Sequence, residues 1–344
     1  MSGFYTLSSQ DQAERLIELA RAALTQWNGR FSDLELFKNR ENAVFSVRRE
    51  DGSRVALRVH RAGYHDDEAL RSELFWMAEL GRSGIAVPPV IRAADGSLFI
   101  HAEAPGVPEV RQVDMLGWLS GGPIGADGRL EKSEQFRRIG ALAAQLHAHG
   151  EALPLPKGFT RHRWDEEGLI GADPLWGRFW ELPALTDDDR ALLLEAREQA
   201  REDLATFGKE DARFGMIHAD LIRDNVLEHE GRLQAIDFDD CGFGWYLFEL
   251  ATILNATSGE PDYSRLREAL LAGYRSVRPL PDADLDHLPL FQFLRATTYL
   301  GWLQTRSETE TARDKAPLLI GQCRRWALAY LGREDQDQRK EASR

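Results

Sequence analysis

Three polar residues in the segment 216–237 have types and spacing that could bind a cation and move a proton. Asp220 is followed five residues later by Asn225, and Asp237 ends an apolar run twelve residues after that. The intervening stretch VLEHEGRLQAI predicts a β-hairpin, which would bring Asn225 and Asp237 side by side. Carboxylate and amide oxygens are ligands that suit Mg²⁺.

Asp220 lies on the loop just before this pair of possible metal ligands. A carboxylate in that place can accept or orient the proton of a substrate hydroxyl while a phosphate is transferred. The pattern therefore predicts phosphoryl transfer to an alcohol. The alternative is that these residues only form turns, because Asp and Asn side chains hydrogen-bond the nearby backbone.

Hydrophobic periodicity predicts the elements that must position these residues. Alternating stretches that predict strands are LELFKN, NAVFSVRR and RVALRVHR, and an Asp-Gly turn joins the last two. Two more strands are expected around a second Asp-Gly within 87–106, and a hinge is expected near 102–106. Helical period occurs at 9–27, 66–81, 133–150, 186–207, 245–257, 263–275, 284–305 and 316–331.

This order of elements predicts an α+β protein with two lobes, since strands and helices are segregated along the chain. The expected N-lobe, residues 1–103, is small and β-rich, with a five-stranded sheet plus helices that cover the nucleotide. The expected C-lobe, residues 104–344, is larger and helical and contains the catalytic loop, the metal site and the substrate site. Ligand sites favour the cleft between such lobes.

The composition narrows the class of protein. The 344 residues have a net charge of −13, which argues against a nucleic-acid binder, because that function needs a basic surface. The two cysteines, Cys241 and Cys323, predict neither a disulfide framework nor a zinc site. We see no signal peptide and no apolar stretch of about 18 residues that would span a membrane. We therefore expect a cytoplasmic protein.

The segment HADLIRDN, followed by DFDD, resembles the protein-kinase signature. It is more similar, over about forty residues, to the aminoglycoside phosphotransferase and choline kinase family, which includes homoserine-kinase-like bacterial members. The resemblance implies a protein-kinase-like fold, Asp220 as the catalytic aspartate, and Mg²⁺ held by Asn225 and Asp237. Ala219 replaces the protein-kinase arginine, which favours a small-molecule kinase. His218 is expected to have a structural role beneath the loop.

The same resemblance requires a cation on the third strand to hold the ATP phosphates, and a glutamate on the next helix to position it. Arg58, in VALRVHR, stands where lysine is usual. Its guanidinium can still bind phosphate. Arg61 is the rival candidate, and Glu73 is the expected partner on the helix. The simpler interpretation is that Arg58 is an exposed strand arginine and Glu73 a solvated helix residue.

The loop that should cover the phosphates reads NRENA and contains no glycine. Backbone N–H groups around Asn42 are expected to meet phosphate there. The adenine is expected to pair with hinge backbone at Ala102 to Ala104.

The acceptor side is less defined. Asp239 and Asp240 could contact a substrate ammonium or a second metal, or form a solvated turn. Three tryptophans of an unusual segment, 161–183, could wall the substrate site or cover the helical core; they are Trp164, Trp176 and Trp180.

Together these features predict an ATP- and Mg²⁺-dependent kinase for a small, amine-bearing alcohol, such as a homoserine-, choline- or aminoglycoside-like compound. A protein Ser/Thr kinase and a non-catalytic nucleotide-binding module are the alternatives. The absent glycine loop counts against the first, and the joint presence of Asp220, Asn225 and Asp237 counts against the second. The acceptor, the choice of ATP over GTP and the oligomeric state stay open.

Overall fold

The chain folds into two compact units. The computed structural model describes residues 3–39 and 42–333. The first unit comprises Met1–Gly122, Leu155–Arg161 and His229–Ile236, and the second comprises Pro123–Pro154, His162–Glu228 and Asp237–Arg344.

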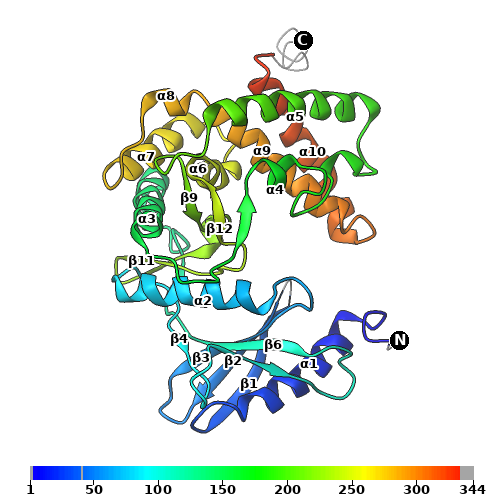
Figure 1. Ribbon diagram of the computed structural model, residues 1–344, viewed down its shortest axis with the longest axis vertical. Coiled ribbons are helices and arrows are strands. Elements are labelled where there is room, and N and C mark those ends of the chain that lie inside the picture. The colour runs from blue at the N-terminus through cyan, green and yellow to red at the C-terminus, as the bar shows by residue number, and fades with distance from the viewer. Residues whose placement is uncertain (1–2, 40–41, 334–344) are drawn as a thin grey trace. The chain divides into compact units, whose positions relative to one another are not determined.

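A six-stranded sheet forms the centre of the first unit (Figure 1). The strand order is β1-β2-β3-β6-β4. Strand β5 pairs with the first residues of β6, and β4 pairs with later ones. The predicted Asp-Gly hairpin is present as β2 and β3, with Ala43 opposite Val59. The strands are β1 (Phe31–Asn39), β2 (Ala43–Arg49), β3 (Arg54–Val59), β4 (Val90–Ile91), β5 (Phe99–Ala102) and β6 (Arg111–Gly117).

Two helices belong to this unit, and both were predicted. Helix α1 (Ser9–Leu24) begins after Ser8, whose side chain accepts the N–H of Asp11, and its apolar face packs on the sheet. Helix α2 (Asp67–Arg82) begins after Asp66, which caps it by accepting the N–H of Ala69. Capping by Ser and Asp satisfies N–H groups that have no partner within the helix. The helical period expected at 66–81 places one apolar stripe of α2 in the core; it consists of Leu70, Leu74, Met77 and Leu80.

Strand β6 corrects the expected division at residue 103. It pairs with β3, β4 and β5, so the chain is still inside the first sheet well beyond the expected hinge at 102–106. The sheet therefore has six strands and not five. Almost every side chain of β6 is buried, including those of Arg111 and Asp114. Because a strand buried on both faces has no alternation of polar and apolar residues, its sequence did not predict a strand.

The second unit is mainly helical. Its helices are α3 (Lys132–Ala152), α4 (Glu166–Ile170), α5 (Asp187–Phe207), α6 (Tyr246–Asn255), α7 (Tyr263–Arg275), α8 (Asp282–Leu285), α9 (Leu288–Gln304) and α10 (Glu310–Tyr330). Helix α3 begins at Lys132 without a side-chain cap. The helix predicted at 284–305 is divided into α8 and α9.

Short strands interrupt these helices in the region around the predicted site. Strand β12 (Gly242–Trp245) lies between β8 (His162–Trp164) and β9 (Phe214–Ile217). A second small sheet has the order β11-β10-β7, formed by β7 (Gly122–Pro123), β10 (Val226–His229) and β11 (Arg232–Ala235). The hairpin predicted between Asn225 and Asp237 is therefore present.

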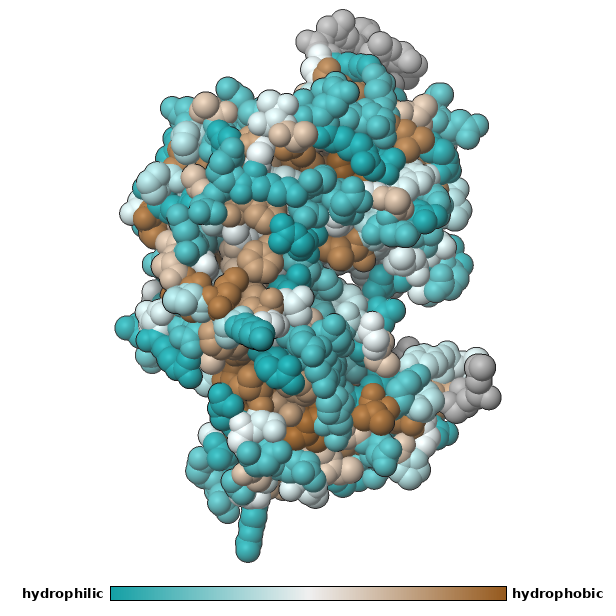
Figure 2. Space-filling view, viewed as in Figure 1, coloured by the Kyte–Doolittle hydropathy of each residue, from teal (hydrophilic) through white to brown (hydrophobic). Residues whose placement is uncertain are grey.

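The surface is largely polar. The face drawn in Figure 2 is mostly hydrophilic, with hydrophobic residues scattered across it. Large hydrophobic side chains that are exposed among the described residues are Tyr5, Phe37, Val110, Leu155, Leu175, Val277 and Leu318. Within residues 3–39 and 42–333, no helix combines the length and the apolar character needed to cross a membrane.

Candidate active site

The loop 218–225 follows strand β9 in the second unit, and its backbone is strained. Ala219 has a φ of +66°, a left-handed conformation that costs roughly 1–3 kcal/mol for a residue other than glycine. Two buried side chains hold it there. Glu249 accepts the N–H of Ala219 at 3.1 Å, and Arg295 donates to its carbonyl oxygen at 3.2 Å. Such strain persists where the surroundings over-determine the conformation.

The carboxylate of Asp220 is held through both of its oxygens. Arg295 donates from Nη2 to Oδ1 at 2.8 Å, and Asn225 donates from Nδ2 to Oδ2 at 3.0 Å. The same Asn225 nitrogen also donates to the backbone carbonyl of Asp220 at 2.9 Å. The side chain of Asp220 remains 22% exposed. The aspartate is thus fixed in one orientation and still reachable by a small molecule.

Opposing effects act on the pKa of Asp220. Burial raises it most, the nearby Arg295 lowers it, and the charge of Asp237 raises it again. The balance leaves the pKa above its usual value. A raised pKa, in a carboxyl group that a ligand can reach, is typical of acid–base residues in functional sites.

Asn225 precedes β10 and Asp237 follows β11, so both offer oxygen ligands at the open end of the β10–β11 hairpin. Because the nitrogen of Asn225 faces Asp220, its amide oxygen is the atom that can bind a cation. Asp237 is exposed and has a φ of +67°, which aspartate tolerates better than most residues. An amide oxygen and a carboxylate suit Mg²⁺, which takes one or two protein carboxylates and completes its octahedron with phosphates and water.

A buried network supports the loop from below. Glu249, on α6, accepts the N–H of His218 at 2.6 Å, and its Oε2 lies 3.8 Å from Nε2 of His147. Burial alone would raise the pKa of Glu249, but His147, His218 and the N–H of Ala219 lower it below the ordinary value. The ring of His218 lies 4.5 Å from that of Phe238, in agreement with the expected structural role.

Arg295 is a site residue that the sequence did not predict. It lies in α9 with a fully buried side chain and touches Asp220 and Ala219 from 75 and 76 residues away. Burial alone would lower the pKa of Arg295, but Tyr299 and Asp220 raise it, so the guanidinium stays charged. The signal in the sequence was an arginine in the middle of an apolar helix. A charged side chain there is expected to be buried, and a buried charge is expected to have a partner.

Two tryptophans of the segment 161–183 have different surroundings. Trp164 is buried, stacks on Phe248 with ring centroids 5.8 Å apart, and donates to the carbonyl of Asp240 at 2.8 Å. Trp176 is half-buried, and the guanidinium of Arg295 lies 5.1 Å from its ring centre. Trp164 is therefore part of the core, whereas Trp176 lies beside the residue that holds the site.

Within the first unit, the predicted pair on β3 and α2 is present. Nη2 of Arg58 lies 2.9 Å from Oε1 of Glu73, and both side chains are buried. Arg161 lies 3.6 Å from the other oxygen of Glu73. The interpretation of Arg58 as an exposed strand arginine is therefore wrong. The rival residue, Arg61, is exposed.

A second carboxylate, which the sequence did not predict, also holds Arg58. Asp114 on β6 accepts two hydrogen bonds from the guanidinium, at 2.9 and 2.7 Å, and one contact from His60 at 2.7 Å. Burial alone would raise the pKa of Asp114, but Arg58 and His60 lower it below the ordinary value. Strand register places Arg58 opposite Asp114, and that register was out of reach because β6 was not predicted.

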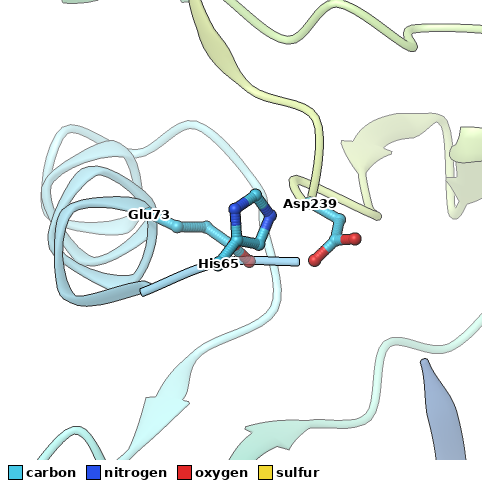
Figure 3. Close-up of side chains that lie close together, drawn as sticks. All are labelled: His65, Glu73 and Asp239. Atoms are coloured by element: carbon cyan, nitrogen blue, oxygen red, sulfur yellow. The ribbon is translucent and has the colours of Figure 1, made fainter. Parts of the chain in front are cut away.

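The remaining predicted residues lie on a helix or on loops. Glu73 projects from α2, and Asp239 comes from the loop after β11 (Figure 3). His65, which was not predicted, lies on the loop before α2. Asp239 is buried and Asp240 is half-buried. The side-chain oxygen of Asn42 accepts the backbone N–H of Arg61 at 3.0 Å.

The two alanines expected to bind adenine lie inside the first sheet. Ala102 is paired with Arg111 in the β5–β6 ladder, and the carbonyl of Ala104 accepts the N–H of Val107 in the turn that follows. The expectation was based on a hinge at 102–106. Strand β6 continues the sheet beyond that point. The segment that follows the completed sheet in the chain is therefore 118–122, and not 102–106.

Comparison with known proteins agrees with this geometry. The model of the phosphotransferase enzyme family matches residues 33–286. A homoserine kinase of Pseudomonas aeruginosa (strain LESB58) is 30% identical over 285 residues, which cover 80% of this chain and 81% of that protein. A homoserine kinase of Polaromonas naphthalenivorans (strain CJ2) is 27% identical over 290 residues, covering 81% and 82% of the two chains.

Solved structures extend the likeness over nearly the whole chain. The structure of a microcompartment-associated aminopropanol kinase has 33% sequence identity and a TM-score of 0.81, and the match covers 91% of this chain and 97% of that one. The amicoumacin kinase hAmiN, at 20% identity, has a TM-score of 0.74 with 93% of each chain covered, which shows the fold. The loop geometry, the family match and these likenesses agree that the chain belongs to the phosphotransferase enzyme family, with the protein-kinase-like fold, and is an ATP-dependent kinase that acts on an alcohol group.

Proposed function

We propose that the chain transfers the γ-phosphate of ATP to the hydroxyl of a small, amine-bearing acceptor. The observation that supports this most is the carboxylate of Asp220, fixed between Arg295 and Asn225 yet partly exposed. Two of the names found among the relatives, homoserine kinase and aminopropanol kinase, denote acceptors with an amine and a hydroxyl. An amino alcohol or a hydroxy amino acid is therefore the acceptor class we favour.

In this proposal Asp220 receives or orients the proton of the acceptor hydroxyl. The hydroxyl oxygen forms a bond to the γ-phosphorus, the bond from that phosphorus to the β–γ bridging oxygen breaks, and ADP leaves. The proton then passes from Asp220 to solvent or to the product. Asn225 and Asp237 would hold Mg²⁺, which supplies neutralisation of the phosphate charge.

The pair of Arg58 and Glu73 lies in the first unit and resembles the cation and glutamate that kinases use to hold the phosphates. Because Asp114 also binds Arg58, we propose that the guanidinium is held in one fixed orientation and does not act as a mobile phosphate ligand. Asn42 stays the proposed residue of the phosphate-covering loop, and adenine recognition is proposed for backbone of residues 118–122.

The test is Mg²⁺-dependent release of ADP from ATP with a panel of acceptors. The panel contains 1-amino-2-propanol, ethanolamine, homoserine, threonine, choline and an aminoglycoside. We expect one class to stimulate release, and we expect Asp220→Asn to lower kcat by about 10²–10⁴-fold, the usual contribution of a general base. The exposed neighbour Asp224 provides the control, and Asp224→Asn should keep the activity. Stimulation that survives Asp220→Asn would contradict the assigned role.

A further inference from the structure

The guanidinium of Arg295 is fully buried, where a charge is unfavourable unless it has partners. Its side chain has no exposed surface, and it lies in the middle of α9 among apolar residues. Burying a charge without partners costs several kcal/mol, so a buried arginine is retained only where polar groups contact its guanidinium. The partners of Arg295 therefore indicate what the residue does.

Each of these partners lies on the loop 218–225 or on the next turn of α9. One nitrogen, Nη2, donates to Oδ1 of Asp220 at 2.8 Å and to the hydroxyl of Tyr299 at 2.9 Å. The other, Nη1, donates to the carbonyl of Ala219 at 3.2 Å. One rigid, planar group thus fixes both the strained backbone of the loop and the carboxylate next to it.

Aromatic rings keep this guanidinium in place. Its central carbon lies 4.5 Å from the ring centre of Tyr299, 5.1 Å from that of Trp176 and 5.9 Å from that of Phe248. Arginine is attracted to aromatic faces at such distances, and the attraction is stronger in a desolvated site. These rings could have bound a substrate ammonium, but they contact a cation of the chain itself.

Because Arg295 binds only one oxygen of Asp220, the carboxylate is divided into two distinct ends. Oδ1 faces the cation, and Oδ2 faces the amide of Asn225. Arg295, on α9, therefore helps to fix the direction in which Oδ2 points towards Asn225, the residue that would bind the metal. Removal of Arg295 would free the carboxylate to rotate and would release the carbonyl of Ala219.

We propose that Arg295, enclosed by Trp176 and Tyr299, is a positioning residue that orients Asp220 for proton transfer; this rests on the proposed function. Arg295 does not touch substrate in this proposal, because its side chain is fully buried. It acts through Asp220 alone.

The experiment compares kcat and KM for the acceptor in the full-length wild type, Arg295→Ala, Arg295→Lys and Tyr299→Phe. Arg295 acts through Asp220 and does not touch the acceptor, so its loss should affect the reacting geometry and not acceptor binding. Arg295→Ala should therefore lower kcat by about 10–100-fold, with KM for the acceptor within about twofold of the wild type. Arg295→Lys should lower kcat less, because the charge is kept while the planar geometry is lost.

Two further measurements separate positioning from a general loss of structure. Added guanidinium, at millimolar concentrations that leave the wild type unaffected, should restore activity of Arg295→Ala about tenfold or more. Tyr299→Phe keeps the ring but removes one partner of Nη2, so its defect should have the same direction and be smaller. The control is Arg213→Ala, which removes an arginine that also lies over an aromatic ring and pairs with Asp284 at 2.8 Å, away from the loop 218–225.

The outcomes distinguish the inference from the function on which it rests. A fall in kcat at an unchanged KM in Arg295→Ala but not in Arg213→Ala, together with guanidinium rescue, supports the positioning role. If the wild type turns over but the two variants have the same kcat, or if Arg295→Ala changes KM alone, the inference alone is overturned. If no acceptor stimulates the wild type, the proposed function fails, and the inference fails with it. A poorly folded Arg295→Ala leaves Arg295→Lys and Tyr299→Phe to decide by the same fall in kcat.

Discussion

Individual charged side chains hold together the loop 218–225 in the second unit and the pair of Arg58 and Glu73 in the first. Four of them, namely Arg58, Asp114, Glu249 and Arg295, are almost completely buried, and each has an oppositely charged or histidine partner. A buried charge is tolerable only while its partner is present, since the remaining charge would otherwise be left without solvation. Removal of one partner should therefore cost far more than removal of an exposed pair.

The pair of Arg58 and Asp114 allows a direct comparison of a buried and an exposed pair on one sheet. Asp114→Asn should lower the free energy of unfolding by about 3–5 kcal/mol, the usual cost of breaking a buried ion pair. The control is Asp33→Asn, in an exposed pair with Arg48 whose side chains are 59% and 50% exposed; it should cost under about 1 kcal/mol. Urea unfolding of both variants checks this. Equal losses would show that Asp114 is not structurally important.

Glu249 predicts a pH dependence of stability. Its pKa is lowered in the folded protein, so its contribution is present above the ordinary pKa of about 4.3 and is lost as the pH falls through the folded value. Glu249→Gln should therefore cost about 1.5–3 kcal/mol at neutral pH, as expected for hydrogen bonds to a charged group. The difference from the wild type should shrink below pH 4.

Thermal unfolding between pH 3 and pH 8 measures this difference. The exposed Glu195, which pairs with Arg333, provides the control, and Glu195→Gln should follow the wild type throughout. A difference for Glu249→Gln that stays constant with pH would contradict the assignment of an ionised Glu249.

Helices cross closely where glycines allow it. Helices α3 and α7 are in extensive contact, and each has a glycine at the crossing. A Cβ atom at Gly273 would overlap with the carbonyl oxygen of Arg137, and one at Gly140 would overlap with that of Leu270. The backbones approach each other so closely that no side chain fits between them.

This contact predicts opposite effects for two glycine substitutions. Gly273→Ala should lower the free energy of unfolding by about 1–3 kcal/mol, because overpacking forces the two helices apart. Gly321→Ala in α10 should raise it by roughly 0.5–1 kcal/mol, since alanine favours a helix and its Cβ would meet nothing closer than Arg325 at 4.0 Å. Thermal unfolding of both variants tests this. Destabilisation of the two variants by the same amount would contradict the close crossing.

Over the entire chain, nucleotide binding and folding should be coupled. Cys241 and Cys323 are both buried in the second unit, and burial raises the pKa of the Cys323 thiol. Buried thiols react only when the surrounding structure opens. Their labelling therefore reports how often the second unit opens.

If ATP·Mg²⁺ binds the folded chain alone, it should slow this labelling. At a free ligand concentration of 100 times Kd, stabilisation of about 2.7 kcal/mol corresponds to about a hundredfold slower reaction. Labelling with a thiol reagent, with and without ATP·Mg²⁺, measures the effect. Asp237→Ala should lose most of the protection, whereas Asp224→Asn should keep it. Protection that is equal in both variants would exclude Asp237 as a metal ligand.

Local sequence was sufficient where function depends on neighbours along the chain. Asp220, Asn225 and Asp237 lie on one loop and the ends of one hairpin, so their spacing alone predicted the hairpin and their proposed roles. The pairing of Arg58 with Glu73 was predicted as well, because a strand and the helix after it are close in sequence. Most helices of the second unit were recognised by their helical period.

Only the tertiary structure decided which distant side chains complete these sites. Asp114 meets Arg58 from 56 residues away, and Arg295 meets Asp220 from 75 residues away. The first contact depends on the register of β6. This strand has no alternating pattern and was not predicted, so the hinge was placed too early in the chain. The second depends on how α9 packs beneath the loop 218–225. Local periodicity shows which face of an element is buried, but the partner of a buried charge is chosen by packing between elements that are far apart in the chain.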